Sequence, residues 1–288
     1  MIVEPLFSVL IANYNNGRFL QEAIDSVLEQ TYSNWEVIIV DDKSTDNSFE
    51  IYEKYKDDSR FHICFNEKNM GCGYTKRRCA ELANGEICGF LDPDDALAKD
   101  AIEIMIKEHE LHEDVSMVYS RYYYADEQLI ILGVSEHQCV LPDGVSFMEY
   151  GDGAISHFVS FKKSYYDQTV GIDEGYRRAV DHALYFLLEE VGKTHFIDKP
   201  LYYYRSNTGL NISTNGNSDY AFYWDVIVMA DACKRRGMSV EEVAFRKMDA
   251  FINEIKEVYY QKGANAVRLS RTYTVGKRVL KPFKWLKK

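Results

Sequence analysis

Carboxylates gather directly after short apolar runs of this sequence. Asp41 and Asp42 follow the run that ends at Val40, and the segment D-P-D-D, Asp92 to Asp95, follows the run that ends at Leu91. Crowded carboxylates are costly to ionise together unless a cation neutralises them. Oxygen ligands of this kind suit Mg²⁺ or Mn²⁺, which keep coordination positions open for phosphates. The residue types therefore predict a divalent-metal site for a phosphorylated ligand, with ordinary turn formation by Asp and Pro as the alternative.

The apolar pattern of the first 120 residues predicts how these side chains meet. Short apolar runs alternate with helical stripes, which is typical of an α/β domain with a largely parallel sheet. Ligands of such sheets bind at the carboxyl ends of the strands. The predicted strands are Phe7–Ala12, Trp35–Val40, Phe61–Phe65 and Ile87–Leu91. The predicted helices begin near Phe19 and Phe49, span Tyr74–Asn84 with Gly85 as the stop, and follow the D-P-D-D segment, with Ala101, Ile102, Met105 and Ile106 inward.

The second half of the chain has a weaker pattern. Beyond Val115 the alternation fades, and tyrosine-rich stretches predict mixed sheet and loops, followed by two helices over about 220–234 and 243–260. Because no linker or repeat separates the halves, we expect one compact body. We divide the chain into a main domain over 1–215, a helical extension over 216–262 that packs on it, and a basic tail over 263–288.

The charges are unevenly distributed along the chain. The formal net charge of −11, from 34 Lys and Arg against 45 Asp and Glu, argues against a nucleic-acid-binding protein. Nine basic residues and no acidic residue follow Glu257, which leaves 25 basic and 45 acidic residues, or −20, for residues 1–257. The tail fits a basic amphipathic helix kinked at Pro282, which favours contact with an anionic membrane surface. A disordered solubilising tail is the alternative.

Cysteine usage and hydropathy favour a cytoplasmic protein. The six cysteines include no C-x-x-C pair and no zinc-ligand spacing, so we expect reduced and mostly buried thiols. The sequence shows no signal-peptide pattern and no apolar run long enough to span a bilayer. We therefore expect a cytoplasmic protein that reaches the inner face of the membrane through its tail.

Three ordered blocks resemble family 2 glycosyltransferases of the GT-A fold, the type that builds bacterial cell-surface polysaccharides. They are Ser8–Asp46, Gly85–Asp95 with the D-x-D motif of that fold, and Gly171–Leu188 followed by K-P-L-Y-Y-Y-R at Lys199–Arg205. The resemblance implies a mostly parallel nucleotide-binding sheet flanked by helices, with a mixed acceptor-side region and C-terminal helices.

The resemblance also implies roles for individual residues. Tyr14 would stack on the base of a nucleotide, and Asp42 would accept a hydrogen bond from it. Asp92 would contact the ribose or the metal, Asp94 would be the principal ligand of Mn²⁺ or Mg²⁺, and Asp181 would be the catalytic base. The implied nucleotide-sugar-binding set is Ala12, Tyr14, Asp42, Lys76, Arg77 and Asp92.

Departures from the family pattern bear on these roles. The chain has Ala12-Asn13-Tyr14-Asn15 where the family commonly has Pro-Thr-Tyr-Asn. It has Thr75-Lys76-Arg77 in place of Ala-Arg-Asn, so either Lys76 or Arg77 would hold the diphosphate. Val180 replaces the Glu that usually precedes the base, which should change the acceptor side or the pKa of Asp181 without removing the base. The alternative for Asp181 is an ordinary helix N-cap.

Other candidate residues are weaker. His157 lies where the family contacts the donor or acceptor sugar, but a lone histidine is more often structural. His109 and His112, without further ligands, are expected on a solvated helix face. Asp95 is expected to be an accessory or capping residue, and Tyr202–Tyr204 to be core and cleft wall.

These observations predict a metal-dependent inverting glycosyltransferase. It would move a sugar from a nucleoside diphosphate donor, with a UDP-sugar favoured, to a glycan or lipid-linked acceptor. A metal would neutralise the leaving diphosphate, and one carboxylate base would direct a single displacement with inversion. The main alternative is a non-catalytic nucleotide-binding or glycan-binding module in polysaccharide assembly. A sugar nucleotidyltransferase ranks lower, because Asn13–Arg18 offers only Gly17 where a glycine-rich, arginine-containing loop is needed.

Overall fold

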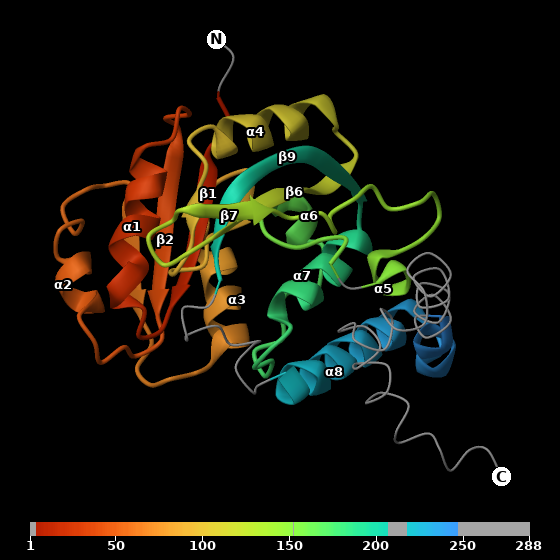
Figure 1. The fold of residues 1–288 in the computed structure, drawn as a ribbon. Coiled ribbons are helices and arrows are strands. Elements are labelled where there is room, and N and C mark those ends of the chain that lie inside the picture. Colours follow the sequence, from red (N-terminus) through yellow and green to blue (C-terminus); the bar gives the residue numbers. More distant parts are fainter. Residues whose placement is uncertain (1–3, 152, 207–217, 247–288) are drawn as a thin grey trace, which may run out of the picture.

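The computed structural model describes residues 4–151, 153–206 and 218–246 of the chain. Its strands are β1 (Phe7–Asn13), β2 (Trp35–Asp41), β3 (Phe61–Phe65), β4 (Ile87–Phe90), β5 (Ala96–Leu97), β6 (Val115–Ala125), β7 (Ile131–Val134), β8 (Val159–Lys162) and β9 (Lys193–Arg205). Its labelled helices are α1 (Gly17–Leu28), α2 (Ser48–Tyr52), α3 (Cys72–Leu82), α4 (Ala101–Leu111), α5 (Phe147–Tyr150), α6 (Lys163–Tyr166), α7 (Val180–Glu189) and α8 (Ser218–Arg236). Residues 240–246 are also helical. The elements form one curved sheet with helices on both sides (Figure 1).

The sheet has a parallel part and a mixed part. Its strand order is β3-β2-β1-β4-β8-β6-β9-β5, with β7 paired to β6. The strands β3, β2, β1 and β4 are mutually parallel, as the alternating pattern of the first 120 residues predicts. Beyond them, β8 runs antiparallel to both β4 and β6, whereas β9 runs parallel to β6. The expected change to a mixed sheet in the second half is therefore confirmed.

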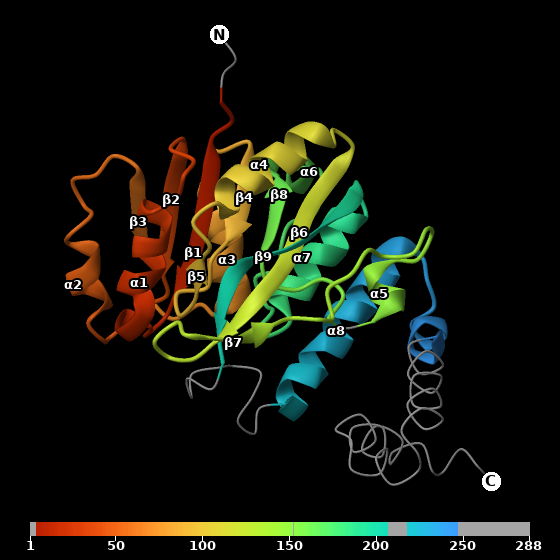
Figure 2. The same cartoon turned by 45° about the horizontal axis from the view of Figure 1, so that its top comes forward.

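The period-two alternation of the central strands separates two hydrophobic cores. On β1, Val9 and Ile11 pack into the core under α1 and α4, whereas Leu10 packs into the core under α3, α7 and α8. All three side chains are fully buried. Figure 2 shows these two groups of helices on either side of the sheet. Such a strand can be apolar throughout because both of its faces are covered.

Helix α8 belongs to the core below α7. Its Val228 and Ala232 are buried in the same core as Leu184 of α7. In addition, Asp225 Oδ1 lies 2.7 Å from the ring Nδ1 of His182 in α7. The expected helix over 220–234 is thus present, with wider bounds. Of the expected helix over 243–260, residues 243–246 are helical and the others lie outside the described residues, as does the tail over 263–288. The division into three parts stays a prediction.

The end of α3 differs from the prediction. The helix ends at Leu82, because Ala83 is extended and the backbone N–H of Asn84 donates to Glu36 Oε1 at 2.7 Å. Gly85 is therefore not the helix stop. Instead it allows close packing, since a Cβ there would lie 2.6 Å from the Leu6 carbonyl oxygen.

Two further predictions about the region after D-P-D-D are wrong in part. The short strand β5 precedes the helix, because Ala96 and Leu97 pair with β9 before α4 begins at Ala101. His109 does not lie on a solvated face, because it is 2% exposed and its Nε2 lies 3.0 Å from Ser160 Oγ.

The expectation that the cysteine thiols are mostly buried is only half right. Cys79, Cys88 and Cys233 are buried, and the other three cysteines are partly exposed.

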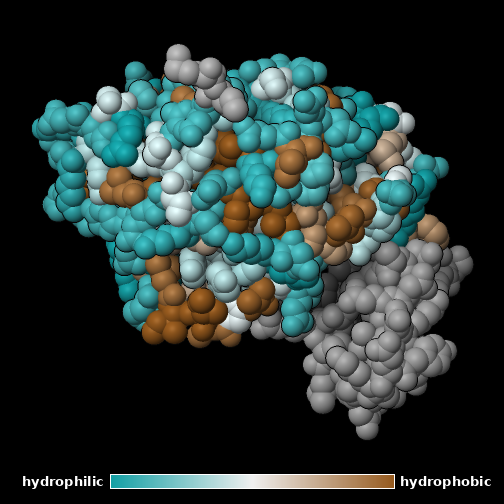
Figure 3. Space-filling model, turned by 90° about the horizontal axis from the view of Figure 1, so that it is seen from above, coloured by the Kyte–Doolittle hydropathy of each residue, from teal (hydrophilic) through white to brown (hydrophobic). Residues whose placement is uncertain are grey.

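Hydrophilic and hydrophobic residues are both present on the surface of the protein. On the face seen in Figure 3, hydrophilic residues interrupt the hydrophobic patches, which is normal for a folded domain. Among the described residues, no helix has the length and apolar character needed to cross a membrane.

A buried carboxylate joins three segments at the start of the sheet. Glu36 accepts hydrogen bonds from Ser8 Oγ at 2.6 Å and from the Asn84 side chain at 3.0 Å, besides the Asn84 backbone. Burial raises the pKa of Glu36, but these hydrogen bonds outweigh it and hold the pKa below its usual value. The ionised carboxylate therefore stabilises the folded state.

We expect Glu36→Gln to lower the free energy of unfolding at neutral pH by about 1 to 3 kcal/mol, because a charged acceptor is lost from a buried network. Since the folded pKa is depressed, the contribution is fully present above the unfolded pKa of about 4.3 and is lost as the pH falls through the folded pKa. Urea denaturation at neutral and acidic pH measures this difference. Glu50→Gln, at an exposed position of α2, is the control. An equal loss at both pH values would contradict the role of the charge.

Candidate active site

Three neighbouring strands deliver polar side chains to one edge of the sheet. The strands β2, β1 and β4 are adjacent and parallel, so the residues that follow them share an edge. Asp42 follows β2, Tyr14 follows β1, and Asp92 comes two residues after β4. The sequence prediction that these residues lie at one edge is therefore confirmed, and Tyr14 follows the strand that lies between those preceding the two carboxylates.

Buried hydrogen bonds fix the loops after β1 and β2. Asn13 Nδ2 donates to Tyr52 Oη at 2.7 Å and to Ser48 Oγ at 2.9 Å, and Tyr52 Oη donates to Asp41 Oδ2 at 2.7 Å. Asp41 is thus a structural residue, 3% exposed, that ties the two strand ends to α2. The Tyr14 ring is left 48% exposed beside this cluster, which makes it accessible to a ligand.

Asp42 fixes a third loop. Its Oδ1 accepts from Asn66 Nδ2 at 2.8 Å and from the Met70 N–H at 2.7 Å, and its Oδ2 accepts from the Gly71 N–H at 2.7 Å. These bonds hold the segment that leads into α3. Asp42 is 3% exposed, and its predicted contact with a nucleotide base stays a prediction.

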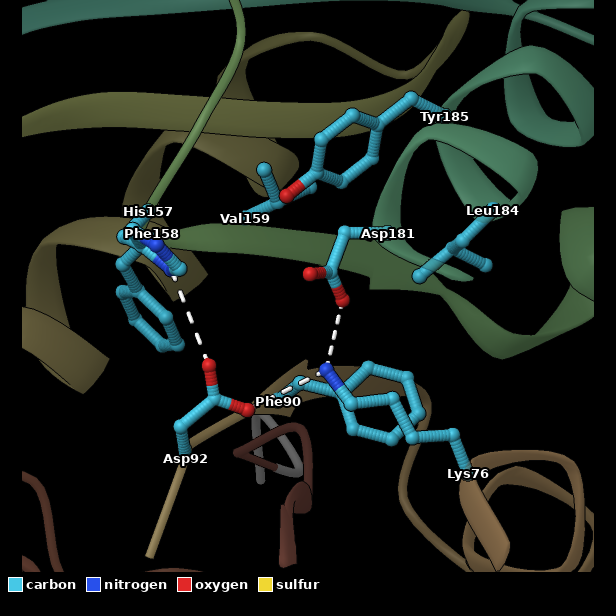
Figure 4. Close-up of a pocket in the computed structure, with 9 residues that line it drawn as sticks. All are labelled: Lys76, Phe90, Asp92, His157, Phe158, Val159, Asp181, Leu184 and Tyr185. Atoms are coloured by element: carbon cyan, nitrogen blue, oxygen red, sulfur yellow. Dashed lines mark hydrogen bonds and ion pairs between the residues drawn. The ribbon is translucent and has the colours of Figure 1, made fainter. Parts of the chain in front are cut away.

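Lys76 lies between two carboxylates from distant parts of the chain. Its Nζ is 2.6 Å from Asp181 Oδ1 in α7 and 3.2 Å from Asp92 Oδ1, and it lies 5.0 Å from the centre of the Phe90 ring (Figure 4). The side chain of Lys76 is 7% exposed, against 29% for Asp92 and 40% for Asp181. A buried ammonium thus connects two partly exposed carboxylates.

The structure distinguishes the two basic residues that the sequence left open. Lys76 is on the buried side of α3 and points into the pocket of Figure 4. Arg77, the next residue, points away and binds Glu81 at 2.7 Å and the Ile172 carbonyl oxygen at 3.1 Å. Successive residues of a helix are rotated by about 100°, so they face different sides. Of the two, Lys76 is the residue that accompanies Asp92 and Asp181.

Charge and burial oppose each other in this cluster. Burial would lower the pKa of Lys76, but the carboxylates of Asp181 and Asp92 raise it well above its usual value. Burial would raise the pKa of Asp181, but the Lys76 ammonium holds it below its usual value. Asp181 is therefore ionised and Lys76 charged at neutral pH.

Asp181 does not cap its helix. The N-cap position of α7 is Ala179, in a left-handed conformation, and no side chain forms a capping hydrogen bond there. Asp181 follows in the first turn, and its carboxylate points to Lys76 instead. The N-cap alternative for this residue is therefore wrong.

His157 lies in the same group, which the sequence rated as a weaker candidate. Its Nδ1 is 3.9 Å from Asp92 Oδ2, and its ring stacks on Tyr204 with a centroid distance of 4.9 Å and on Tyr202 at 5.4 Å. The expectation that these tyrosines form core and cleft wall agrees with a Tyr202 that is 1% exposed. Burial lowers the pKa of His157, although Asp92 opposes this.

The D-P-D-D carboxylates have three different surroundings. Asp95 is buried and accepts hydrogen bonds from Tyr202 Oη at 2.8 Å and the Arg205 N–H at 2.7 Å, so it joins this segment to β9. Burial and the neighbouring Asp92 raise the pKa of Asp94 to about 6. Carboxylate or imidazole atoms of Asp92, Asp95 and His157 that could ligate a metal lie within 4.8 Å of one another, a group that differs from the expected pair of Asp92 and Asp94.

Asp92, Asp181 and Lys76 line a small pocket. Figure 4 shows Asp92 and Asp181 both pointing toward the Lys76 nitrogen, with His157 above Asp92 and Tyr185 above Asp181. The lining residues are Lys76, Phe90, Asp92, His157, Phe158, Val159, Asp181, Leu184 and Tyr185. Phe90 and Tyr185 are absent from the sequence-based site, because an apolar strand end and a helix face give no chemical signal.

This α/β architecture, with a curved and largely parallel sheet and an acidic site at the strand ends, is the GT-A glycosyltransferase fold. The Glycosyl transferase family 2 profile matches residues 8–168, which is more than half of the chain. The chain therefore belongs to glycosyltransferase family 2 and is a transferase.

Two curated relatives support this assignment. The chain is 28% identical over 276 residues to the glycosyltransferase GlyG of Streptococcus pneumoniae and covers 88% of each protein. It is 40% identical over 101 residues to the putative teichuronic acid biosynthesis glycosyltransferase TuaG of Bacillus subtilis, over 35% of this chain and 40% of that protein. The chain thus spans less than half of the length of TuaG.

A solved structure supports the fold. The structure of S. aureus TarS, residues 1–349, aligns with a TM-score of 0.65 and 19% identity, over 89% of this chain and 74% of the other. At this identity the likeness shows the fold alone. TarS has also been solved with UDP and with UDP-GlcNAc.

We expect Lys76→Met to raise the pKa of Asp181, because the adjacent positive charge that favours the ionised carboxylate is removed. An NMR titration of ¹³C-labelled aspartate carboxyls measures this pKa directly. The matched control is Lys99→Met, since Lys99 is exposed and pairs with Glu29. An unchanged Asp181 pKa in a folded Lys76→Met protein would contradict the pairing.

Proposed function

We propose that this glycosyltransferase transfers a sugar from a UDP-sugar to a glycan or lipid-linked acceptor, with metal assistance and inversion of configuration. The observation that carries the proposal is the placement of Asp92 and Asp181 on either side of Lys76 in one pocket. One carboxylate follows the sheet edge where the donor would bind, and the other begins the helix across the pocket. The proposed donor site and the proposed base thus both contact the ammonium group of Lys76.

The nucleotide would bind along the edge formed by β2, β1 and β4. Tyr14 offers an exposed ring for stacking on a base, Ala12 lies one residue before the end of β1, and Asp42 holds the adjoining loop. The complexes of TarS with UDP and UDP-GlcNAc support a uridine nucleotide. Lys76 would contact the diphosphate, because an ammonium can exchange a carboxylate partner for a phosphate oxygen.

A divalent metal ion fits the donor side of the site. The pKa of about 6 for Asp94 reflects a buried carboxyl beside the Asp92 carboxylate, and a bound cation would relieve this repulsion. Asp92 and Asp94 would hold Mn²⁺ or Mg²⁺, with His157 in reach of Asp92. The metal would supply charge neutralisation of the leaving diphosphate.

Asp181 would act as the general base. Its carboxylate is ionised at neutral pH and 40% exposed, so an acceptor hydroxyl can reach it. The depressed pKa favours the proton-free form but weakens the base. Transfer of the Lys76 contact to the donor diphosphate would restore basicity to Asp181 when the donor is in place. This coupling would make the base strongest in the complex that reacts.

The acceptor side is proposed from the class of the relatives. The name of TuaG places that protein in teichuronic acid biosynthesis, which supports a glycan or lipid-linked acceptor for this chain. The alternative is a module that binds nucleotide or glycan without turnover. Release of UDP in the presence of an acceptor distinguishes the two.

We expect Asp181→Asn to reduce kcat by about 10²- to 10⁴-fold, because a neutral amide cannot accept the acceptor proton. Binding of UDP with Mn²⁺, measured by thermal shift, should persist in this variant. Before these measurements, a screen of UDP, GDP, CMP and dTDP sugars, with and without Mn²⁺, identifies the donor. Asp94→Asn should lose the Mn²⁺-dependent part of UDP binding. The proposal fails if folded Asp181→Asn keeps full transfer.

The control for both variants is Asp57→Asn, on an exposed position beyond α2. It should leave transfer and donor binding unchanged. A screen in which none of the sugar nucleotides stabilises the protein would overturn the donor assignment rather than the base.

The basic tail is proposed to bind an anionic membrane surface. Each Lys or Arg near such a surface contributes about 1 kcal/mol. We expect deletion of residues 264–288 to weaken co-sedimentation with phosphatidylserine vesicles and to leave transfer to a soluble acceptor largely intact. Vesicles of neutral phosphatidylcholine are the control. Unchanged binding to the anionic vesicles would favour the solubilising alternative.

A further inference from the structure

Two histidines and a glutamate meet outside the pocket of Figure 4. Glu108 lies in the last turn of α4, His112 follows that helix as its C-cap residue, and His195 is the third residue of β9. His195 Nε2 is 3.2 Å from Glu108 Oε2, and His112 Nε2 is 3.6 Å from the same oxygen. The two imidazole rings face each other with a centroid distance of 4.0 Å. All three ligand atoms lie within 4.8 Å of one another.

These distances match the edges of a metal coordination polyhedron. A tetrahedral Zn²⁺ with ligands at about 2.0 to 2.1 Å places neighbouring ligand atoms about 3.3 to 3.5 Å apart. The two distances to Glu108 Oε2 lie on either side of this range. Small rotations of the side chains would therefore bring the three atoms onto one ion. The fourth position would be open to water, as in sites with three protein ligands.

The backbone holds the three residues in place. His195 pairs with Val118 within the β6 and β9 ladder, so its position is fixed by the sheet. Helix α4 packs on the same sheet, and its buried His109 lies 3.0 Å from Ser160 of β8. The site is therefore built on regular elements. The side chains of Glu108, His112 and His195 are 22%, 40% and 30% exposed, which leaves a path for an ion.

We propose that Glu108, His112 and His195 form a second metal site, which takes a transition-metal ion such as Zn²⁺ and fastens the end of α4 to β9. Imidazole ligands favour Zn²⁺, whereas carboxylate and water ligands favour Mg²⁺ and Mn²⁺. The site thus differs in chemistry from the carboxylates of D-P-D-D. The ammonium group of the nearby Lys162 donates hydrogen bonds to the carbonyl oxygens of His112 and Glu113, at 2.9 and 2.8 Å.

Isothermal titration of the chelator-treated full chain with Zn²⁺ tests the proposal. We expect the wild-type protein to bind about one Zn²⁺ ion more than the His112→Gln, His195→Gln double variant. Zn²⁺ should raise the thermal midpoint of the wild type and have a smaller effect on the variant. Co²⁺ in place of Zn²⁺ should give a visible absorption band that the variant lacks.

The matched control is His137→Gln, an exposed histidine elsewhere on the surface. It should bind Zn²⁺ as the wild type does. If the double variant fails to fold, Glu108→Gln keeps both imidazoles and should weaken Zn²⁺ binding by at least about tenfold. Equal Zn²⁺ stoichiometry and affinity in the wild type and a folded ligand variant would overturn the proposal.

Discussion

A single buried ammonium organises the candidate site. Lys76 comes from α3, Asp92 follows β4, and Asp181 begins α7, so their ion pairs join three segments that are distant in the sequence. A buried charge is stable only when its partners stay in place, and removal of one partner is strongly destabilising. The carboxylates keep enough exposure to exchange this partner for a ligand. The same interaction therefore holds the three segments around the pocket, and under the proposed function its atoms would be the ones that a donor contacts.

The sheet topology supplies the partners of Lys76. Parallel neighbours β2, β1 and β4 bring Tyr14 and Asp92 to one edge, as expected for open α/β sheets. The antiparallel β8 then turns the chain back beside β4, which places His157 at the same edge. Strand β9 adds Tyr202, whose hydroxyl donates to Asp95. The mixed half of the sheet thus completes a site that the parallel half begins.

Local patterns in the sequence predict the elements better than they predict the contacts. The strands from Phe7, Trp35 and Phe61 are recoverable because their apolar runs are bounded by turn residues. The distinction between Lys76 and Arg77 depends on which side of α3 packs on the sheet, and both sides of that helix carry polar residues. The sequence around His112 does not indicate its ring contact with His195, because His195 lies on a strand 83 residues later. Pairings of this kind follow from topology and leave no local signal.

The charges around D-P-D-D bear on how the proposed acidic site would accept an anionic donor. Asp92 is balanced by Lys76, and Asp95 is held by Tyr202 and the Arg205 backbone. Burial and Asp92 raise the pKa of Asp94 to about 6, so a bound cation would favour the ionised form of this carboxyl. A divalent ion at Asp94 would change this edge from repulsive to attractive for a diphosphate. Metal and donor would therefore bind with positive coupling, each more tightly in the presence of the other.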